Sequence, residues 1–196
     1  MRNWESFVLL LVDVQNDFWD ESTAEHHSHF TENVTRLLAF CRSEGIEIVH
    51  LRAGFKADKS DWMAKYKSGD WIPCVENTEG IDVLPCAVAH SDEHIFVKQT
   101  FDGFQNPNLA AYLKASNKQF VLVAGLITSV CVLLTAASAA QRGYLTAVVE
   151  DCCADRSAMH DHVLDNYPFI FERVLVNGLA ERHAAWQTAL HQLASA

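Results

Sequence analysis

Short runs of aliphatic residues recur along the chain, and most of them are continuously apolar rather than alternating with polar residues. The runs that predict strands are Phe7–Val12, Ile46–Leu51, Ile95–Val97, Phe120–Ala124, Thr146–Val149 and Arg173–Val176. A strand that is apolar at successive positions is typical of a parallel sheet covered on both faces. The pattern therefore predicts a buried sheet at the centre of the molecule.

Helical patterns lie between these runs. In Glu32–Glu44 the apolar residues fall on one stripe, and Gly45 provides a natural stop. Further helices are expected over Asn108–Ser116, Val130–Arg142 and Ala180–Leu193. Because strands alternate with helices, right-handed crossovers and a doubly wound, three-layer α/β/α fold follow.

The length of 196 residues fits one domain, 1–196. Only the segment 53–91 breaks the alternation, and it is long for a loop in a compact domain. It contains Trp62 and Trp71 as well as Pro73 and Pro85. We expect this segment to be a lid-like insertion that covers a binding site.

Composition and charge narrow the class of protein. A formal charge of −10 argues against a nucleic-acid partner, which requires clustered Lys and Arg. No apolar run approaches the roughly 20 residues of a membrane span, and the N-terminus lacks the basic region of a signal peptide. The chain has six cysteines but no C-x-x-C, so reduced thiols and a cytoplasmic location are expected.

Three reactive side chains follow directly from predicted strands. Asp13 comes after the first strand, Lys98 after the third, and Cys131 follows the fourth at the start of an Ala-rich helix. Taken singly, these residues could be a loop acid, a lysine reaching the surface and an inert buried thiol. In parallel sheets, however, ligands bind at the carboxyl ends of the strands, where all three would meet.

Together these residues predict a thiol nucleophile. A nearby carboxylate can take the proton of a thiol, and a cationic lysine can stabilise the charges. Since Cys131 falls in the first turn of a helix, the helix dipole is expected to favour its thiolate form. The backbone N–H groups of that turn are candidate donors to an oxyanion.

The residues around these positions resemble those of the isochorismatase-like cysteine hydrolases. The resemblance runs from about Phe7 to about Val176. Its most specific segments are Leu11–Phe18, with the sequence LVDVQNDF, and Gly125–Val132, with the sequence GLITSVCV. Val97–Lys98, followed by Phe101 and Phe104, is a further mark.

The resemblance implies a six-stranded parallel sheet and a triad of Asp13, Lys98 and Cys131. It also implies a cis peptide bond at Leu126–Ile127, which would direct the Ile127 N–H, beside that of Cys131, toward an oxyanion. Members of the family usually hydrolyse small amides, ureides or imides through a thioester, without a metal or organic cofactor. Homo-oligomers, as dimers or tetramers, are likewise expected.

Two alternatives remain open at this stage. Some isochorismatases cleave a vinyl ether without a thiol, in which case Asp13 would act as the acid. A non-catalytic oligomeric scaffold is the second alternative. Nicotinamidase activity is not expected, because the second strand, Val49–Gly54, lacks the metal-binding Asp-x-His motif of those enzymes.

The remaining candidates are aromatic residues and histidines. Walls of the substrate pocket are predicted at Phe18, Trp19, Trp62, Trp71, Phe101 and Phe104, each of which could instead pack in the core. His26, His27 and His29 lie in a polar stretch, and we do not expect them to bind a metal. His160 and His162 are expected to face solvent on a short helix.

Overall fold

The structure is a computed structural model, and it describes residues 2–156 and 159–195. Within these residues six strands form one parallel sheet in the order β3-β2-β1-β4-β5-β6. The strands are β1 (Phe7–Val12), β2 (Glu47–Ala53), β3 (His94–Lys98), β4 (Phe120–Leu126), β5 (Leu145–Ala154) and β6 (Glu172–Val174). The prediction of a six-stranded parallel α/β fold is confirmed.

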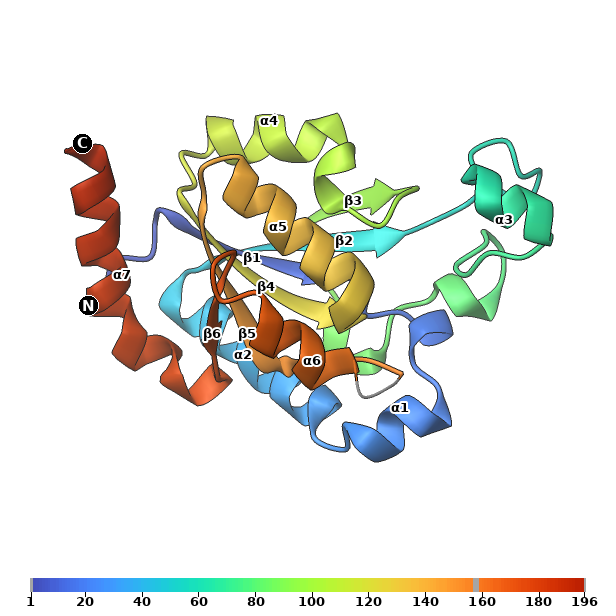
Figure 1. Cartoon of the computed structure of the whole chain (residues 1–196), viewed down its shortest axis with the longest axis horizontal. Coiled ribbons are helices and arrows are strands. Elements are labelled where there is room, and N and C mark those ends of the chain that lie inside the picture. Colours follow the sequence, from blue (N-terminus) through green and yellow to red (C-terminus); the bar gives the residue numbers. More distant parts are fainter. Residues whose placement is uncertain (1, 157–158, 196) are drawn as a thin grey trace.

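Helices cover both faces of the sheet. They are α1 (Glu21–His26), α2 (Phe30–Glu44), α3 (Ala64–Gly69), α4 (Pro107–Ala115), α5 (Leu133–Gln141), α6 (Met159–Asn166) and α7 (Leu179–Ala194). With right-handed crossovers, α2 covers one face while α4, α5 and α6 cover the other (Figure 1). Helix α7 packs Trp186 against Phe120, with ring centroids 4.7 Å apart.

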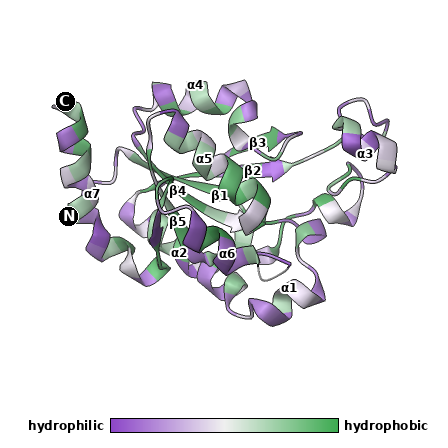
Figure 2. Ribbon diagram, viewed as in Figure 1, coloured by the Kyte–Doolittle hydropathy of each residue, from purple (hydrophilic) through white to green (hydrophobic). Residues whose placement is uncertain are grey.

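The two central strands form the core of the molecule. Every residue of β1 and of β4 is buried. Figure 2 shows these strands as an apolar centre, with hydrophilic residues concentrated on the outer surfaces of the helices. Full burial of one such leucine or valine stabilises the fold by roughly 1.5–3 kcal/mol. The continuous apolar runs in the sequence thus reflect coverage on both faces of the sheet.

Some elements differ from the sequence prediction. Strand β5 continues through Glu150 and Asp151, whose polar side chains bond Arg173 and the Val176 N–H at the sheet edge. The helix predicted over Val130–Arg142 begins as a π-helical turn, Thr128–Val132, before α5. The short helices α1 and α3 were not predicted, because neither carries an apolar stripe.

The segment between β2 and β3 has its own small apolar cluster. Ala53, Phe55, Trp62, Ile72 and Cys74 are buried together. The buried side chain of Gln15 ties this segment to β1, since its Nε2 donates to the carbonyls of Ala53 (2.9 Å) and Ile81 (2.8 Å). Figure 1 shows α3 standing beyond the carboxyl ends of the strands.

A buried carboxylate joins α2 and β2 to the start of β3. Glu93 accepts hydrogen bonds from Arg42 Nε (2.8 Å) and from the His90 N–H (2.8 Å), and it pairs with His50 Nε2 (2.9 Å). Burial raises the pKa of Glu93, but these partners, with Arg42 first, outweigh it and lower the pKa to about 2. The carboxylate is therefore ionised at neutral pH.

All six cysteines are free thiols, and the adjacent pair Cys152 and Cys153 is buried. Across the described residues, none of the helices combines the length and apolar character that a membrane crossing requires.

Candidate active site

The strand order reverses between β1 and β4, and the three reactive side chains meet beside that point. Asp13 follows β1, Lys98 is the last residue of β3, and Cys131 lies in the π-helical turn after β4. In open parallel sheets the point of reversal leaves a crevice at the carboxyl ends of the strands. The fold therefore brings together residues that are 85 and 33 positions apart in the sequence.

The chain bends sharply as it leaves β1. Asp13 has a φ of 49°, a left-handed conformation that Asp tolerates better than most residues, and its N–H donates to the Leu51 carbonyl at 2.8 Å. On the neighbouring strand, a Cβ added to Gly125 would lie 2.0 Å from the Val12 carbonyl oxygen. Glycine at this position thus lets β1 and β4 approach where the site begins.

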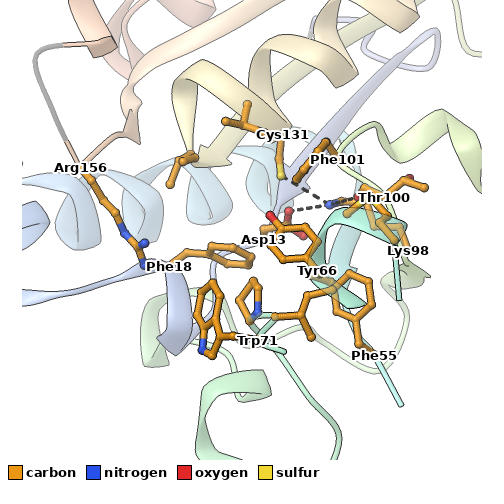
Figure 3. A pocket seen from close by; sticks show the side chains of 16 residues that line it. Asp13, Phe18, Phe55, Tyr66, Trp71, Lys98, Thr100, Phe101, Cys131 and Arg156 are labelled. Carbon is orange, nitrogen blue, oxygen red and sulfur yellow. Dashed lines mark hydrogen bonds and ion pairs between the residues drawn. The ribbon is translucent and has the colours of Figure 1, made fainter. Parts of the chain in front are cut away.

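Lys98 connects the other two reactive groups. Its Nζ lies 2.6 Å from Asp13 Oδ2, 2.8 Å from the Thr100 carbonyl oxygen and 3.7 Å from Cys131 Sγ (Figure 3). These three acceptors match the three N–H donors of an ammonium group. The side chains of Asp13 and Lys98 are 0% and 2% exposed, so the ion pair lies almost entirely out of water.

Burial controls the protonation of this cluster. It raises the pKa of the Asp13 carboxyl, against the opposing charge of Lys98. For Lys98, burial lowers the pKa, but the negative charge of Asp13 outweighs it and the net shift is upward; a thiolate at Cys131 would raise the pKa of Lys98 further. Lys98 is therefore the cation of the site, and Asp13 is a carboxylate with increased proton affinity. Asp13 Oδ1 is buried without a hydrogen-bond partner among the described residues.

The structure overturns the expected preference of Cys131 for the thiolate form. Burial, followed by the negative charge of Asp13, raises the pKa of the Cys131 thiol well above its usual value, although Lys98 opposes the shift. The interaction of a charge with a helix dipole is worth about 0.3–1 kcal/mol at an exposed site, which is too small to offset the desolvation of a buried Cys131 thiolate. At rest Cys131 is a neutral thiol beside a base.

An apolar cavity of about 190 Å³ opens onto the three residues. Of the predicted walls, Phe18, Trp71 and Phe101 line it. Sequence reasoning missed several lining residues, among them Phe55, Met63, Tyr66, Ile72, Thr100 and Arg156. Thr100 could have been found from its position two residues after Lys98, whereas α3 gave no signal at all.

The other three predicted walls pack elsewhere. Trp19 stacks on Phe30 with ring centroids 4.8 Å apart. Trp62 belongs to the small cluster beneath the segment between β2 and β3, and its Nε1 donates to the Lys56 carbonyl at 2.7 Å. Phe104 is buried in the main core. None of these three side chains lines the cavity, and sequence position alone does not distinguish them from the three that do.

Two residues of the loop and helix after β5 hold the turn that carries Cys131. His160 Nδ1 lies 2.8 Å from the Thr128 hydroxyl, and Asp155 Oδ2 accepts from the Ser129 N–H at 2.8 Å. The prediction that His160 faces solvent is wrong, because its ring is half-buried against His27, with centroids 4.9 Å apart. His162 is exposed, as expected.

The remaining site predictions concern metal ligands and backbone donors. In the described part of the chain, no group of three or more His, Cys, Asp or Glu side chains is arranged to hold a metal ion, and His26 and His29 belong to no such group. The Leu126–Ile127 peptide bond is cis. Ile127 and Cys131, the predicted oxyanion donors, both line the cavity.

The sequence of this chain is similar to those of characterised amide hydrolases. A nicotinamidase from Escherichia coli is 28% identical over 173 residues, covering 74% of this chain and 81% of that protein. A maleamate amidohydrolase from Pseudomonas putida is 30% identical over 129 residues, covering 64% of this chain and 60% of that protein.

Solved structures share the fold. An isochorismatase family protein from Desulfovibrio vulgaris superposes with a TM-score of 0.83 at 24% identity, covering 91% of this chain and 98% of that one. The family model described as the isochorismatase domain matches residues 7–175. This chain therefore belongs to the isochorismatase family of hydrolases.

Proposed function

We propose that this protein is a cysteine-dependent amidase that hydrolyses a C–N bond of a small molecule through a thioester on Cys131. The observation that carries the proposal is the contact of one buried ammonium, Lys98 Nζ, with both Asp13 Oδ2 at 2.6 Å and Cys131 Sγ at 3.7 Å. A thiol, a base and a fixed cation at the end of one cavity are the parts that nucleophilic catalysis requires.

In the first half of the reaction, Asp13 takes the proton of Cys131 as the sulfur attacks the carbonyl carbon. The raised pKa of the Asp13 carboxyl makes it a stronger base than an exposed aspartate, while Lys98 remains positively charged. Because the resting thiol is neutral, proton transfer accompanies the attack instead of preceding it. Asp13 then returns this proton to the leaving amine, and the C–N bond breaks.

In the second half, Asp13 accepts a proton from water, and the hydroxide equivalent attacks the thioester carbonyl. The acid product leaves, and the proton passes back to the Cys131 sulfur. The backbone N–H groups of Ile127 and Cys131 are proposed as donors to the oxyanion in both steps. Both residues border the cavity, and Cys131 lies in the turn that opens α5.

The cavity favours a small substrate with an apolar body. Its walls are largely apolar, and its volume of about 190 Å³ suits a molecule of modest size. Of the described lining residues, Arg156 is the one charged side chain besides Asp13 and Lys98. It is positioned by Asp20 Oδ2 at 3.3 Å and by the Asp17 carbonyl, and it faces the cavity opposite the reactive cluster (Figure 3).

We therefore infer an amide whose far end carries a polar or acidic group. The similarity to a nicotinamidase and a maleamate amidohydrolase supports amide hydrolysis as the class of reaction. The missing metal-binding motif after β2 argues against nicotinamide itself.

The experiment is a screen of small primary amides, with and without a carboxylate, followed by measurement of released ammonia. Cys131→Ala should abolish hydrolysis. Cys86→Ala is the matched control, because Cys86 is a half-buried thiol outside the cavity. If Cys131→Ala still hydrolyses the amides, the thioester mechanism is wrong. If the protein instead cleaves a vinyl ether added to the screen, and Cys131→Ala keeps that activity, the chemistry of some isochorismatases, with Asp13 as the acid, replaces this proposal. If no amide or vinyl ether is turned over, the non-catalytic scaffold takes its place.

A further inference from the structure

Tyr66 is a polar residue at the active-site cavity that the proposed mechanism does not use. It lies in α3, on the segment between β2 and β3, and lines the same cavity as Cys131. In Figure 3 its ring extends from the α3 side of the cavity, and its hydroxyl points toward Asp13 and Cys131. The hydroxyl therefore faces the reacting groups from the side opposite the sheet.

The ring of Tyr66 is held by aromatic neighbours. Its centroid lies 6.3 Å from that of Phe101 and 6.5 Å from that of Trp71, and it packs against the apolar cluster around Phe55. These contacts involve only the ring. Removing the hydroxyl would leave them in place, so the ring and the hydroxyl can be tested separately.

The hydroxyl of Tyr66 has no hydrogen-bond partner among the residues that the structure describes. Elsewhere on the same segment the comparable aromatic donor is paired, as Trp62 Nε1 donates to the Lys56 carbonyl at 2.7 Å. A half-buried phenol directed into an apolar cavity without a protein partner is suited to bonding a ligand.

The electrostatics of Tyr66 agree with this placement. Burial raises the pKa of its hydroxyl, a thiolate at Cys131 would raise it further, and Lys98 opposes the shift. A hydroxyl that responds to both residues lies close enough to interact with a molecule bound between them. The hydroxyl stays protonated at neutral pH, so its oxygen can accept a hydrogen bond while its proton points elsewhere.

We propose that the Tyr66 hydroxyl oxygen accepts a hydrogen bond from the N–H of the scissile amide and so orients the leaving amino group. The inference rests on the proposed amidase function and adds a catalytic residue supplied by α3. With the carbonyl oxygen directed at the backbone N–H groups of Ile127 and Cys131, the amino group of a bound amide would face the opposite side. The Tyr66 hydroxyl, which enters the cavity from the α3 side, is the group proposed to meet it there.

The test compares an amide with an ester, because an ester has no N–H to donate. In Tyr66→Phe, labelling of Cys131 by iodoacetamide should slow about five- to tenfold relative to labelling by methyl iodoacetate, the effect of one hydrogen bond. In the same variant, the rate of hydrolysis of a primary amide should fall relative to the rate for the corresponding methyl ester. Peptide mass spectrometry distinguishes Cys131 from the other five thiols.

Tyr144→Phe is the control, because it removes a hydroxyl in a groove with Arg142 and Gly143, away from the active-site cavity. The melting temperature of Tyr66→Phe should match that of the unsubstituted protein, which separates a catalytic role from a structural one. Equal amide-to-ester ratios in both proteins would overturn the role of Tyr66 while leaving amidase activity intact. A changed labelling ratio without amide turnover would instead contradict the proposed function alone.

Discussion

The buried pair of Asp13 and Lys98 predicts strong energetic coupling between two residues that are 85 positions apart. Asp13→Asn removes the negative charge but keeps the shape, and Asn also tolerates the positive φ of 49°. Lys98→Met removes the positive charge but keeps most of the chain length. Each single substitution leaves one charge buried without its partner.

The magnitude follows from the burial of both groups. Breaking a buried ion pair by removing one partner typically destabilises a protein by about 3–5 kcal/mol, because the remaining charge is uncompensated. In the double variant no charge remains, so its loss should fall well below the sum of the single losses, by at least about 2 kcal/mol. Lys98→Met also removes the hydrogen bond to the Thr100 carbonyl. This hydrogen bond is lost both in Lys98→Met and in the double variant. Its contribution therefore cancels when the four free energies of unfolding are combined in a double-mutant cycle.

The assay is urea unfolding of the four proteins at pH 7, with the free energy of unfolding extrapolated to water. A parallel cycle on Arg2 and Glu44, an exposed pair whose charged atoms are 3.1 Å apart, should give a coupling below about 1 kcal/mol. All three active-site variants should be inactive. Additive losses for Asp13 and Lys98, within about 0.5 kcal/mol, would refute the claim that they form one desolvated unit.

Three further predictions concern residues around the site. Gly125→Ala should destabilise the fold far more than Gly143→Ala, because both have positive φ but only the first places a Cβ against backbone, and comparison of the melting temperatures tests this. Glu93→Gln should cost up to about 3 kcal/mol of stability at pH 7. Because the folded pKa of about 2 lies below the usual 4.5, this stability is present above pH 4.5 and lost as the pH falls toward 2. Unfolding curves for both proteins should therefore converge with acid, and a constant difference would contradict the assignment. His160→Phe should keep the ring contact with His27 but lose the bond to the nucleophile turn, lowering kcat about tenfold with little change in KM, which steady-state kinetics on an active amide would measure.

The sequence could predict those features that depend on composition along one segment. Strand β1 was predicted with its observed bounds, since six consecutive apolar residues end at an acid. The meeting of Asp13, Lys98 and Cys131 followed from the rule that parallel strands share one carboxyl edge. Helix α1 left a weaker signal that could have been used, because Asp20 caps it by accepting from the Thr23 N–H.

Features that depend on side-chain direction or distance could not be predicted. Trp62 and Trp71 lie nine positions apart on one segment, yet Trp62 is 8% exposed in a small core while Trp71 is 59% exposed at the cavity. The protonation of Cys131 likewise depends on its burial and on its distance to Asp13, and these reverse the expectation from helix position alone. Tyr66 carried no signal, because α3 is short and without an apolar stripe.

The central claim is that Cys131 forms a covalent thioester during turnover. The most direct measurement is rapid acid quench of the protein with an amide that it hydrolyses, followed by mass spectrometry of the Cys131 peptide. We predict an added mass equal to the acyl group on Cys131, present during turnover and absent once the substrate is exhausted. Steady turnover with no adduct on this peptide, together with full activity in Cys131→Ala, would contradict the account.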